Sequence, residues 1–175
     1  MSKEGYLIRH GAKSSDILYC IVQDGRVTFM DRRGGTVVHQ FGLSRTQLRI
    51  RGATNDEAYM CDNSFVVSVR PTRLVKGRQI PEGMEEDYLL SASSHSERKE
   101  WGNVIHSWQR HYWREPVHVQ LQMTEDEEDE YFRTQVATLT LMLQESPRGK
   151  LKQAIRTISS GKASSMAFTL EQPAY

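Results

Sequence analysis

The stretch that decides the fold is Asp87-Tyr88-Leu89-Leu90-Ser91-Ala92-Ser93, followed at once by Ser94-His95-Ser96-Glu97-Arg98-Lys99-Glu100-Trp101. In its first half, Tyr88, Leu90 and Ala92 share one side of a two-residue repeat, which predicts a half-buried strand. In its second half, Ser94 and Glu97 have the spacing of a capping box, in which each side chain satisfies a free backbone donor at a helix start. A strand therefore runs directly into a capped helix.

The helix predicted after Ser94 carries one apolar stripe. Its members recur at helical spacing, so they face a core: Trp101, Val104, Ile105, Trp108 and Tyr112. Glu115-Pro116 ends this helix, because a residue before proline disfavours the helical region. A last strand that feeds one helix with a buried tryptophan predicts a β-sandwich or barrel plugged at one end. Such an architecture favours a binding module over an enzyme.

Short strands fill the first ninety residues. Asp24-Gly25 is a strong hairpin signal, because glycine adopts positive φ without a steric penalty. A weaker strand, Leu74–Ile80, is followed by the turn Pro81-Glu82-Gly83. These seven short strands, together with the strand before Ser94 and the helix after it, predict an antiparallel sheet closed into a sandwich or barrel. The other six predicted strands are Gly5–His10, Ile17–Gln23, Arg26–Asp31, Thr36–Phe41, Thr46–Arg51 and Ser64–Arg70.

After Pro116 the short alternating strands give way to an acidic run and helical patterns. Thr124 precedes the unbroken acidic run 125–130 and is predicted to cap a helix whose acidic first turn suits the helix dipole. The apolar side of this helix is predicted to be Phe132, Val136, Leu139 and Leu143, and Pro147 opens a second, basic helix. The two helices either pair as a hairpin or belong to a partly disordered tail. We divide the chain into a domain (1–115), an extension (116–158) and a disordered end (159–175).

Composition limits the function classes. The formal charge of +1 gives no reason to expect nucleic acid as a partner, although residues 1–116 carry +3 (17 Lys/Arg against 14 Asp/Glu) and residues 117–175 carry −2 (6 against 8). Cys20 and Cys61 form no C-x-x-C pair, which predicts reduced, packed thiols in a cytoplasmic protein. No apolar run approaches the ~20 residues needed to cross a bilayer, so we expect any membrane contact to be peripheral.

Four segments together resemble a pleckstrin-homology (PH) domain over residues 1–113. The last strand and the helix with Trp101 are the most specific part. The resemblance implies a seven-stranded barrel capped by one C-terminal helix, with no catalytic activity and no cofactor. The segments are Lys3-Glu4-Gly5-Tyr6-Leu7-Ile8-Arg9, Leu18-Tyr19-Cys20-Ile21-Val22, Ser64-Phe65-Val66-Val67, and Tyr88 to Ser93 with Glu97-Arg98 and Glu100-Trp101.

The same resemblance implies a place for an anionic lipid, because many PH domains bind a phosphoinositide headgroup beside the loop between their first two strands. Arg9 and Lys13 match that pattern, whereas Asp16 and Leu18 stand where two basic residues are expected. We therefore expect weak, non-specific attraction to anionic membranes. The alternative is that these are ordinary solvated loop charges. The candidate lipid-binding residues are Arg9, Lys13, Arg26, Arg32 and Arg33.

Other chemistry has little support in the sequence. The six histidines show no metal-ligand spacing, and no nucleophile–base pair or glycine-rich phosphate loop stands out. Two further basic groups are interpreted as a charged outer sheet face, with a protein or lipid surface as the alternative. They are Arg45, Arg49 and Arg51, and Arg70, Arg73, Lys76 and Arg78.

Three hypotheses for function follow. The first is a non-catalytic PH-like adaptor that associates peripherally with anionic or phosphoinositide-containing membranes. The second is a PH fold used only for protein–protein interaction, with a partner bound through residues 117–158. The third is autoinhibition, in which the acidic run Glu125–Glu130 folds back over the basic end of the barrel.

Overall fold

The structure is a computed structural model that describes residues 2–110, 123–154 and 156 of the chain. Within these residues no helix is long and apolar enough to span a bilayer. A short helical segment at 147–154 follows the second long helix. The elements are β1 (Lys3–His10), β2 (Ser15–Gln23), β3 (Arg26–Met30), β4 (Val37–Gly42), β5 (Thr46–Gly52), β6 (Ser64–Val75), β7 (Arg78–Pro81), β8 (Glu86–Ser91), α1 (His95–Arg110) and α2 (Glu125–Glu145).

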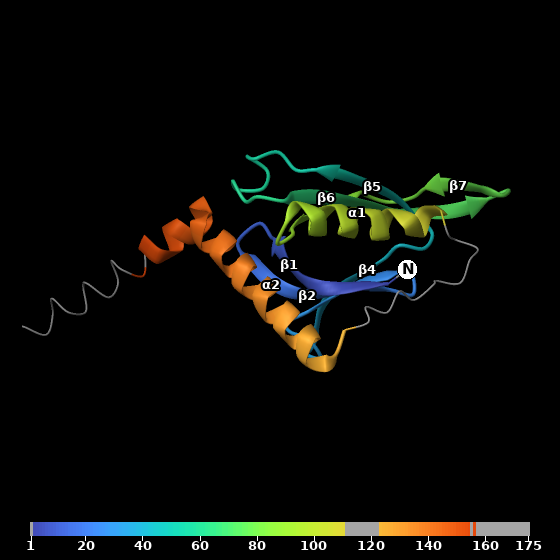
Figure 1. Cartoon of the computed structure of the whole chain (residues 1–175). Helices are drawn as coiled ribbons and strands as arrows, with labels where there is room; N and C mark the ends of the chain where they lie inside the picture. Colours follow the sequence, from blue (N-terminus) through green and yellow to red (C-terminus); the bar gives the residue numbers. More distant parts are fainter. Residues whose placement is uncertain (1, 111–122, 155, 157–175) are drawn as a thin grey trace, which may run out of the picture.

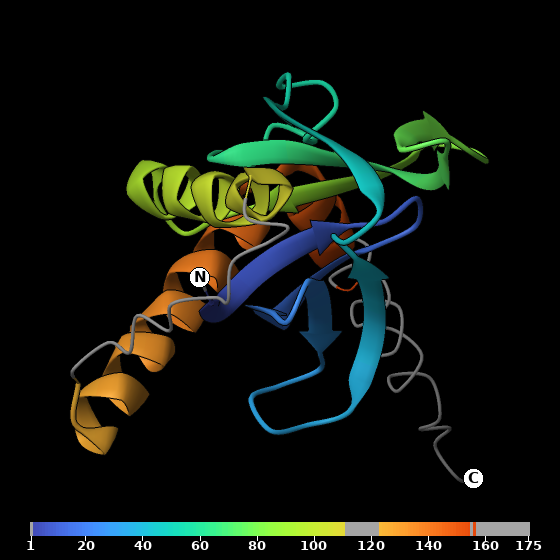
Figure 2. The same cartoon turned by 90° about the vertical axis from the view of Figure 1, so that its right-hand side faces the viewer.

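Seven strands form one antiparallel sheet in the order β4-β3-β2-β1-β8-β6-β5, and β7 pairs only with the outer part of β6. The sheet curls into two layers, and α1 lies between them on one side (Figures 1 and 2). The predicted seven-stranded antiparallel fold with one plugging helix is confirmed. Strands with alternating burial, such as β3 with Val27 and Phe29 inside, favour this arrangement because they have one apolar face to bury.

One predicted strand is wrong. Instead of a strand at Leu74–Ile80, β6 continues to Val75 and the chain reverses at Lys76-Gly77 into β7. Both turn residues have positive φ, 49° and 77°. The correctly predicted turn at Asp24-Gly25 has the same property, with φ values of 51° and 70°. Two-residue hairpin turns favour Asn-Gly and Asp-Gly, so the Lys-Gly pair gave a weaker signal.

The core lies between the two strand layers and α1. Trp101 and Ile105, one helical turn apart, are both fully buried in a single cluster with Leu7, Val67 and Leu90. Val104 and Trp108 pack at the edge of this cluster. The predicted apolar stripe is therefore confirmed as far as Trp108, whereas Tyr112 and the helix end at Glu115-Pro116 lie outside the described residues.

The predicted capping box at α1 forms only in part. The hydroxyl of Ser94 accepts a hydrogen bond from the backbone N–H of Glu97 at 3.1 Å. The carboxylate of Glu97 is engaged elsewhere: it lies 3.1 Å from Nζ of Lys3 and accepts a hydrogen bond from the hydroxyl of Tyr131 in α2. Glu97 thus connects α1 with β1 and with the extension, because a charged partner binds a carboxylate more strongly than a backbone amide does.

α2 packs along the outer face of β1 and β2 (Figure 1). Thr124 caps it with a complete capping box to Glu127, as the sequence predicts. Phe132 and Leu139 are buried as predicted, but Gln135 takes the place expected for Val136, because its Oε1 accepts a hydrogen bond from the backbone N–H of Tyr6 at 2.6 Å. The acidic helix therefore docks on the barrel.

A second, smaller apolar cluster lies under α2. Leu139 and Ile8 are fully buried there with Cys61, and their half-buried neighbours are Tyr6, Ile17, Met142 and Leu143. Both cysteines are free thiols, buried in different clusters: Cys20 in the main core and Cys61 under α2. The end of the chain, 159–175, predicted to be disordered, lies outside the described residues.

Candidate functional site

Two cations lie on the core-facing side of β1, one near each end. Lys3, Leu7 and Arg9 share this side, because side chains two residues apart point the same way along a strand. Arg9 follows Lys3 by six positions, which correspond to about 20 Å along the strand. The two positions differ in their surroundings, and that difference defines the candidate site.

Lys3 is fully neutralised at the end of β1 beside α1. Its Nζ lies 2.8 Å from Glu100 Oε2 and 3.1 Å from Glu97 Oε2, and 5.2 Å from the centre of the Trp101 ring. Its side chain is only 13% exposed. These contacts stabilise the docking of α1 and leave Lys3 unavailable to a ligand.

Arg9 lies at the opposite end, half-buried, with Asp16 and Leu90 as its partners across the neighbouring strands. Within the described residues Arg9 makes no ion pair and no hydrogen bond through its side chain. Its positive charge nevertheless acts on His39. Burial is the larger cause that lowers the pKa of His39, and the charge of Arg9 is the second. A half-buried guanidinium without a paired carboxylate is a candidate contact for an anionic group.

A short hydrogen-bonded chain lies beside Arg9. Nε2 of His39 lies 3.1 Å from the hydroxyl of Tyr88, which donates to Glu86 Oε2 at 2.6 Å. Burial, followed by this bond to Glu86, raises the pKa of Tyr88. We call Arg9, His39, Glu86 and Tyr88 the Arg9 cluster. Glu86 and Asp16 bring negative charge to the cluster, which weakens any attraction for a polyphosphate.

The loop between β1 and β2 holds Lys13, whose side chain is exposed. The backbone closes this loop tightly, since Gly11 N–H donates to Ser14 O at 2.7 Å. Ser14 in turn donates to Asp16 Oδ2 at 3.0 Å, which fixes that carboxylate at the start of β2. Arg9 and Lys13 thus lie at the same end of β1, as the sequence predicts.

Arg148, which sequence reasoning missed, holds this loop from outside. Its guanidinium donates to Gly11 O at 2.9 Å, to Ala12 O at 3.0 Å and to the hydroxyl of Ser15 at 3.2 Å. The same group stacks on the ring of Tyr59, 3.4 Å from its centre. No local pattern reveals these contacts, because more than 130 residues separate Arg148 from the loop.

Arg32 and Arg33 lie in the loop between β3 and β4, near the other end of α2. Arg33 binds the acidic run directly: NH2 lies 2.6 Å from Glu128 Oε2 and NH1 lies 3.3 Å from Asp129 Oδ1. Its guanidinium also lies 4.8 Å from the centre of the Phe132 ring. Arg32 is exposed, and within the described residues its side chain makes no ion pair. The two arginines are therefore not equivalent.

Arg26 is remote from Arg9 and Lys13. It pairs with Gln23 at the far end of β2, whereas Arg9 pairs with Asp16 near the start of that strand. The seven positions from Asp16 to Gln23 correspond to about 23 Å along the strand. The five predicted lipid-binding residues thus form three separate groups: Arg9 with Lys13, Arg32 with Arg33, and Arg26 alone.

Solved structures similar to this chain include PH domains at low sequence identity. The C-terminal PH domain of pleckstrin, in complex with D-myo-Ins(1,2,3,4,5)P5, is 18% identical with a TM-score of 0.42, and the match covers 60% of this chain and 94% of that one. The PH domain of Slm1, in complex with inositol-4-phosphate, is 18% identical with a TM-score of 0.41, covering 59% and 90%.

A third similar structure, the tandem PX-PH domains of Bem3 from Saccharomyces cerevisiae, is 16% identical with a TM-score of 0.41, covering 59% of this chain and 40% of that one. No family model and no curated protein matches the sequence. Within the described residues, no three His, Cys, Asp or Glu side chains gather in a way that could hold a metal ion.

Proposed function

We propose that this chain is a non-catalytic PH-like adaptor that associates weakly with anionic membrane surfaces at the cytoplasmic side, without selecting one phosphoinositide headgroup. The observation that carries the proposal is the contrast along β1. Lys3 is neutralised by two carboxylates, whereas Arg9 is half-buried without an ion pair among the described residues.

Lys13 and Arg32 support the same function, because both are exposed loop cations without an acidic partner in the described part of the chain. A cation near an anionic bilayer surface contributes about 1 kcal/mol, so a few such residues produce weak, salt-sensitive binding. Free, buried thiols at Cys20 and Cys61 agree with a reducing compartment.

The same geometry argues against tight headgroup selection. Asp16 lies directly across from Arg9, Glu86 lies in the Arg9 cluster, and Arg26 is about 23 Å away along the sheet. A polyphosphate bound beside Arg9 would lie near two cations, Arg9 and Lys13, and near two carboxylates, Asp16 and Glu86. Specific recognition requires several converging charge-assisted hydrogen bonds, and this arrangement does not supply them.

Vesicle co-sedimentation of the full chain tests the proposal. Vesicles with phosphatidylserine should bind the protein at low salt, and neutral phosphatidylcholine vesicles should not. Arg9→Gln with Lys13→Gln removes two charges worth about 2 kcal/mol together, so the partition coefficient should fall about thirtyfold. Arg26→Gln with Arg49→Gln is the matched control, because it removes two exposed charges elsewhere on the barrel. Absence of binding at low salt would refute the proposal, as would an equal loss in the control.

A second candidate function is supported by a different observation. Glu128 and Asp129 of α2 form ion pairs with Arg33. In this alternative the PH fold binds a protein partner, and the acidic segment masks part of its basic surface. The double variant Glu128→Gln with Asp129→Asn releases Arg33, whereas Asp126→Asn removes a charge from the same run without touching Arg33. Masking predicts stronger vesicle binding in the double variant only. A module that binds proteins alone predicts no vesicle binding in any variant.

A further inference from the structure

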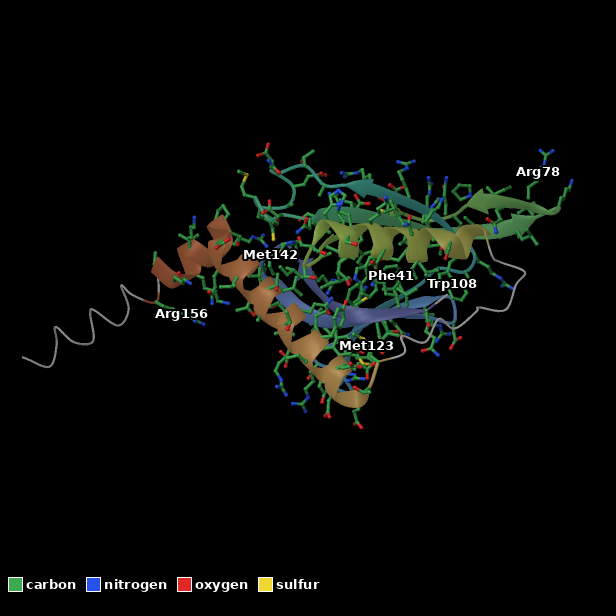
Figure 3. The ribbon with its side chains drawn as sticks, in the orientation of Figure 1. Phe41, Arg78, Trp108, Met123, Met142 and Arg156 are labelled. Atoms are coloured by element: carbon green, nitrogen blue, oxygen red, sulfur yellow. The ribbon has the colours of Figure 1, made fainter. Side chains whose placement is uncertain are left out.

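The β6–β7 hairpin projects from the barrel as an arm, which we define as residues 70–84. Beyond Pro71, β6 pairs only with β7, and β7 pairs with no other strand. Figures 1 and 3 show the arm extending past the rest of the fold, with Arg78 near its tip. The arm contributes nothing to either apolar cluster, so core packing does not explain its composition.

The arm is strongly basic. Residues 70–81 contain four cations and no acidic residue: Arg70, Arg73, Lys76 and Arg78. Arg73 has only a loose, exposed ion pair with Glu82, at 3.8 Å. Lys76 and Arg78, at the tip, make no ion pair within the described residues. The charge at the tip is therefore fully available to an anionic partner.

The arm also exposes large apolar side chains. Met84 is 86% exposed, Leu74 is 69% exposed and Ile80 is 46% exposed. Leu74 pairs with Gln79, whereas Ile80 pairs with Arg73, so the two apolar residues emerge from opposite faces of the hairpin. Exposed apolar side chains gathered on one projecting element indicate an interaction site.

We propose that this arm inserts its tip into the interface of an anionic bilayer. The proposal deepens the membrane association proposed above and rests on it. A protein surface would cover one face of a hairpin, whereas a bilayer interface surrounds the hairpin and accommodates Leu74 and Ile80 together. The arginine and lysine stems can follow the apolar side chains while their charged ends reach the phosphates.

The first test compares salt dependence. Leu74→Ser with Ile80→Ser changes the two exposed apolar side chains that the proposal inserts, and neither belongs to an apolar cluster, so the fold should be unaffected. Salt weakens electrostatic attraction and leaves apolar insertion unchanged, so the double variant should bind phosphatidylserine vesicles at least tenfold more weakly than the parent both at low salt and at 150 mM salt. Leu141→Ser, which is 59% exposed on α2, is the matched control and should behave as the parent chain.

The outcomes separate the two proposals. A parent chain that fails to bind anionic vesicles at low salt refutes the proposed function, and the arm proposal with it. A parent chain that binds, while the Leu74→Ser, Ile80→Ser variant binds as tightly as the parent at both salt concentrations, overturns the arm proposal alone. Equal weakening by Leu141→Ser also overturns it, because the effect would not belong to the arm.

A fluorescent label locates the contact directly. Both native cysteines are buried, so an environment-sensitive nitrobenzoxadiazole label reacts selectively at an added Gln79→Cys. Its emission should shift to the blue on binding to phosphatidylserine vesicles. The same label at Ala137→Cys, exposed on α2, should not shift. A label at residue 79 that stays in water on vesicles that do bind the chain overturns insertion, and a protein partner would then be the occupant to test.

Discussion

Leu139→Ala tests whether the extension is an integral part of the fold. Leu139 is fully buried between α2 and the outer face of β1, in one cluster with Ile8 and Cys61. Replacing a buried leucine by alanine costs about 2–5 kcal/mol. The rim of this small cluster is half-buried and can partly collapse, so we expect the lower part of that range, about 2–3 kcal/mol. Leu141→Ala, two residues away and 59% exposed, should cost less than about 0.5 kcal/mol.

Urea unfolding followed by circular dichroism measures the difference. With a slope of about 2 kcal/mol per molar urea, Leu139→Ala should lower the midpoint by about 1–1.5 M, and Leu141→Ala should leave it in place. If α2 detaches before the barrel unfolds, the loss should appear as faster amide hydrogen exchange in residues 131–143. A Leu139→Ala variant that matches Leu141→Ala in both measurements would show that α2 does not dock on β1.

Two further predictions concern the barrel. Trp101→Ala should lower the free energy of unfolding by about 3–5 kcal/mol, because the ring is fully buried, and an unchanged melting temperature would contradict the assigned core. Burial and then the charge of Arg148 lower the pKa of His10 from 6.5 to about 4. The unfolded chain therefore binds more protons between these values, so stability should fall as pH drops from 6.5 to 4. His10→Gln should show a shallower fall, and equal slopes would contradict a buried neutral imidazole.

Most elements were predictable because their causes are local. Alternation of apolar residues marks the strands, and Ser94 and Thr124 mark the starts of the two long helices by accepting a nearby backbone hydrogen bond. The failures have two origins, one local and one long-range. The Lys76-Gly77 turn lacks the usual asparagine or aspartate. The carboxylate of Glu97 pairs with Lys3, which is distant in sequence, instead of completing the capping box at Ser94.

The candidate site was less predictable, because strand direction and packing decide which of its cations lie near one another. Arg9 and Lys13 do lie together, since one tight loop joins them. Arg26 is close to Arg32 and Arg33 in sequence, but the direction of β3 carries it to the far end of the sheet. The Arg9 cluster joins residues from three strands, and the hydrogen bond between His39 and Tyr88 spans 49 positions.

The sequence by itself determined the alternating strands, the capped helix with Trp101 and the acidic helix after Thr124, because each depends on residues within a few positions of one another. Only the tertiary structure decided which cations are neutralised. Lys3 and Arg33 meet carboxylates from α1 and α2, whereas Arg9 and the tip of the arm meet none among the described residues. The reason is physical: ion pairing depends on which faces the curled sheet and the two helices bring together, and residue spacing does not encode that packing.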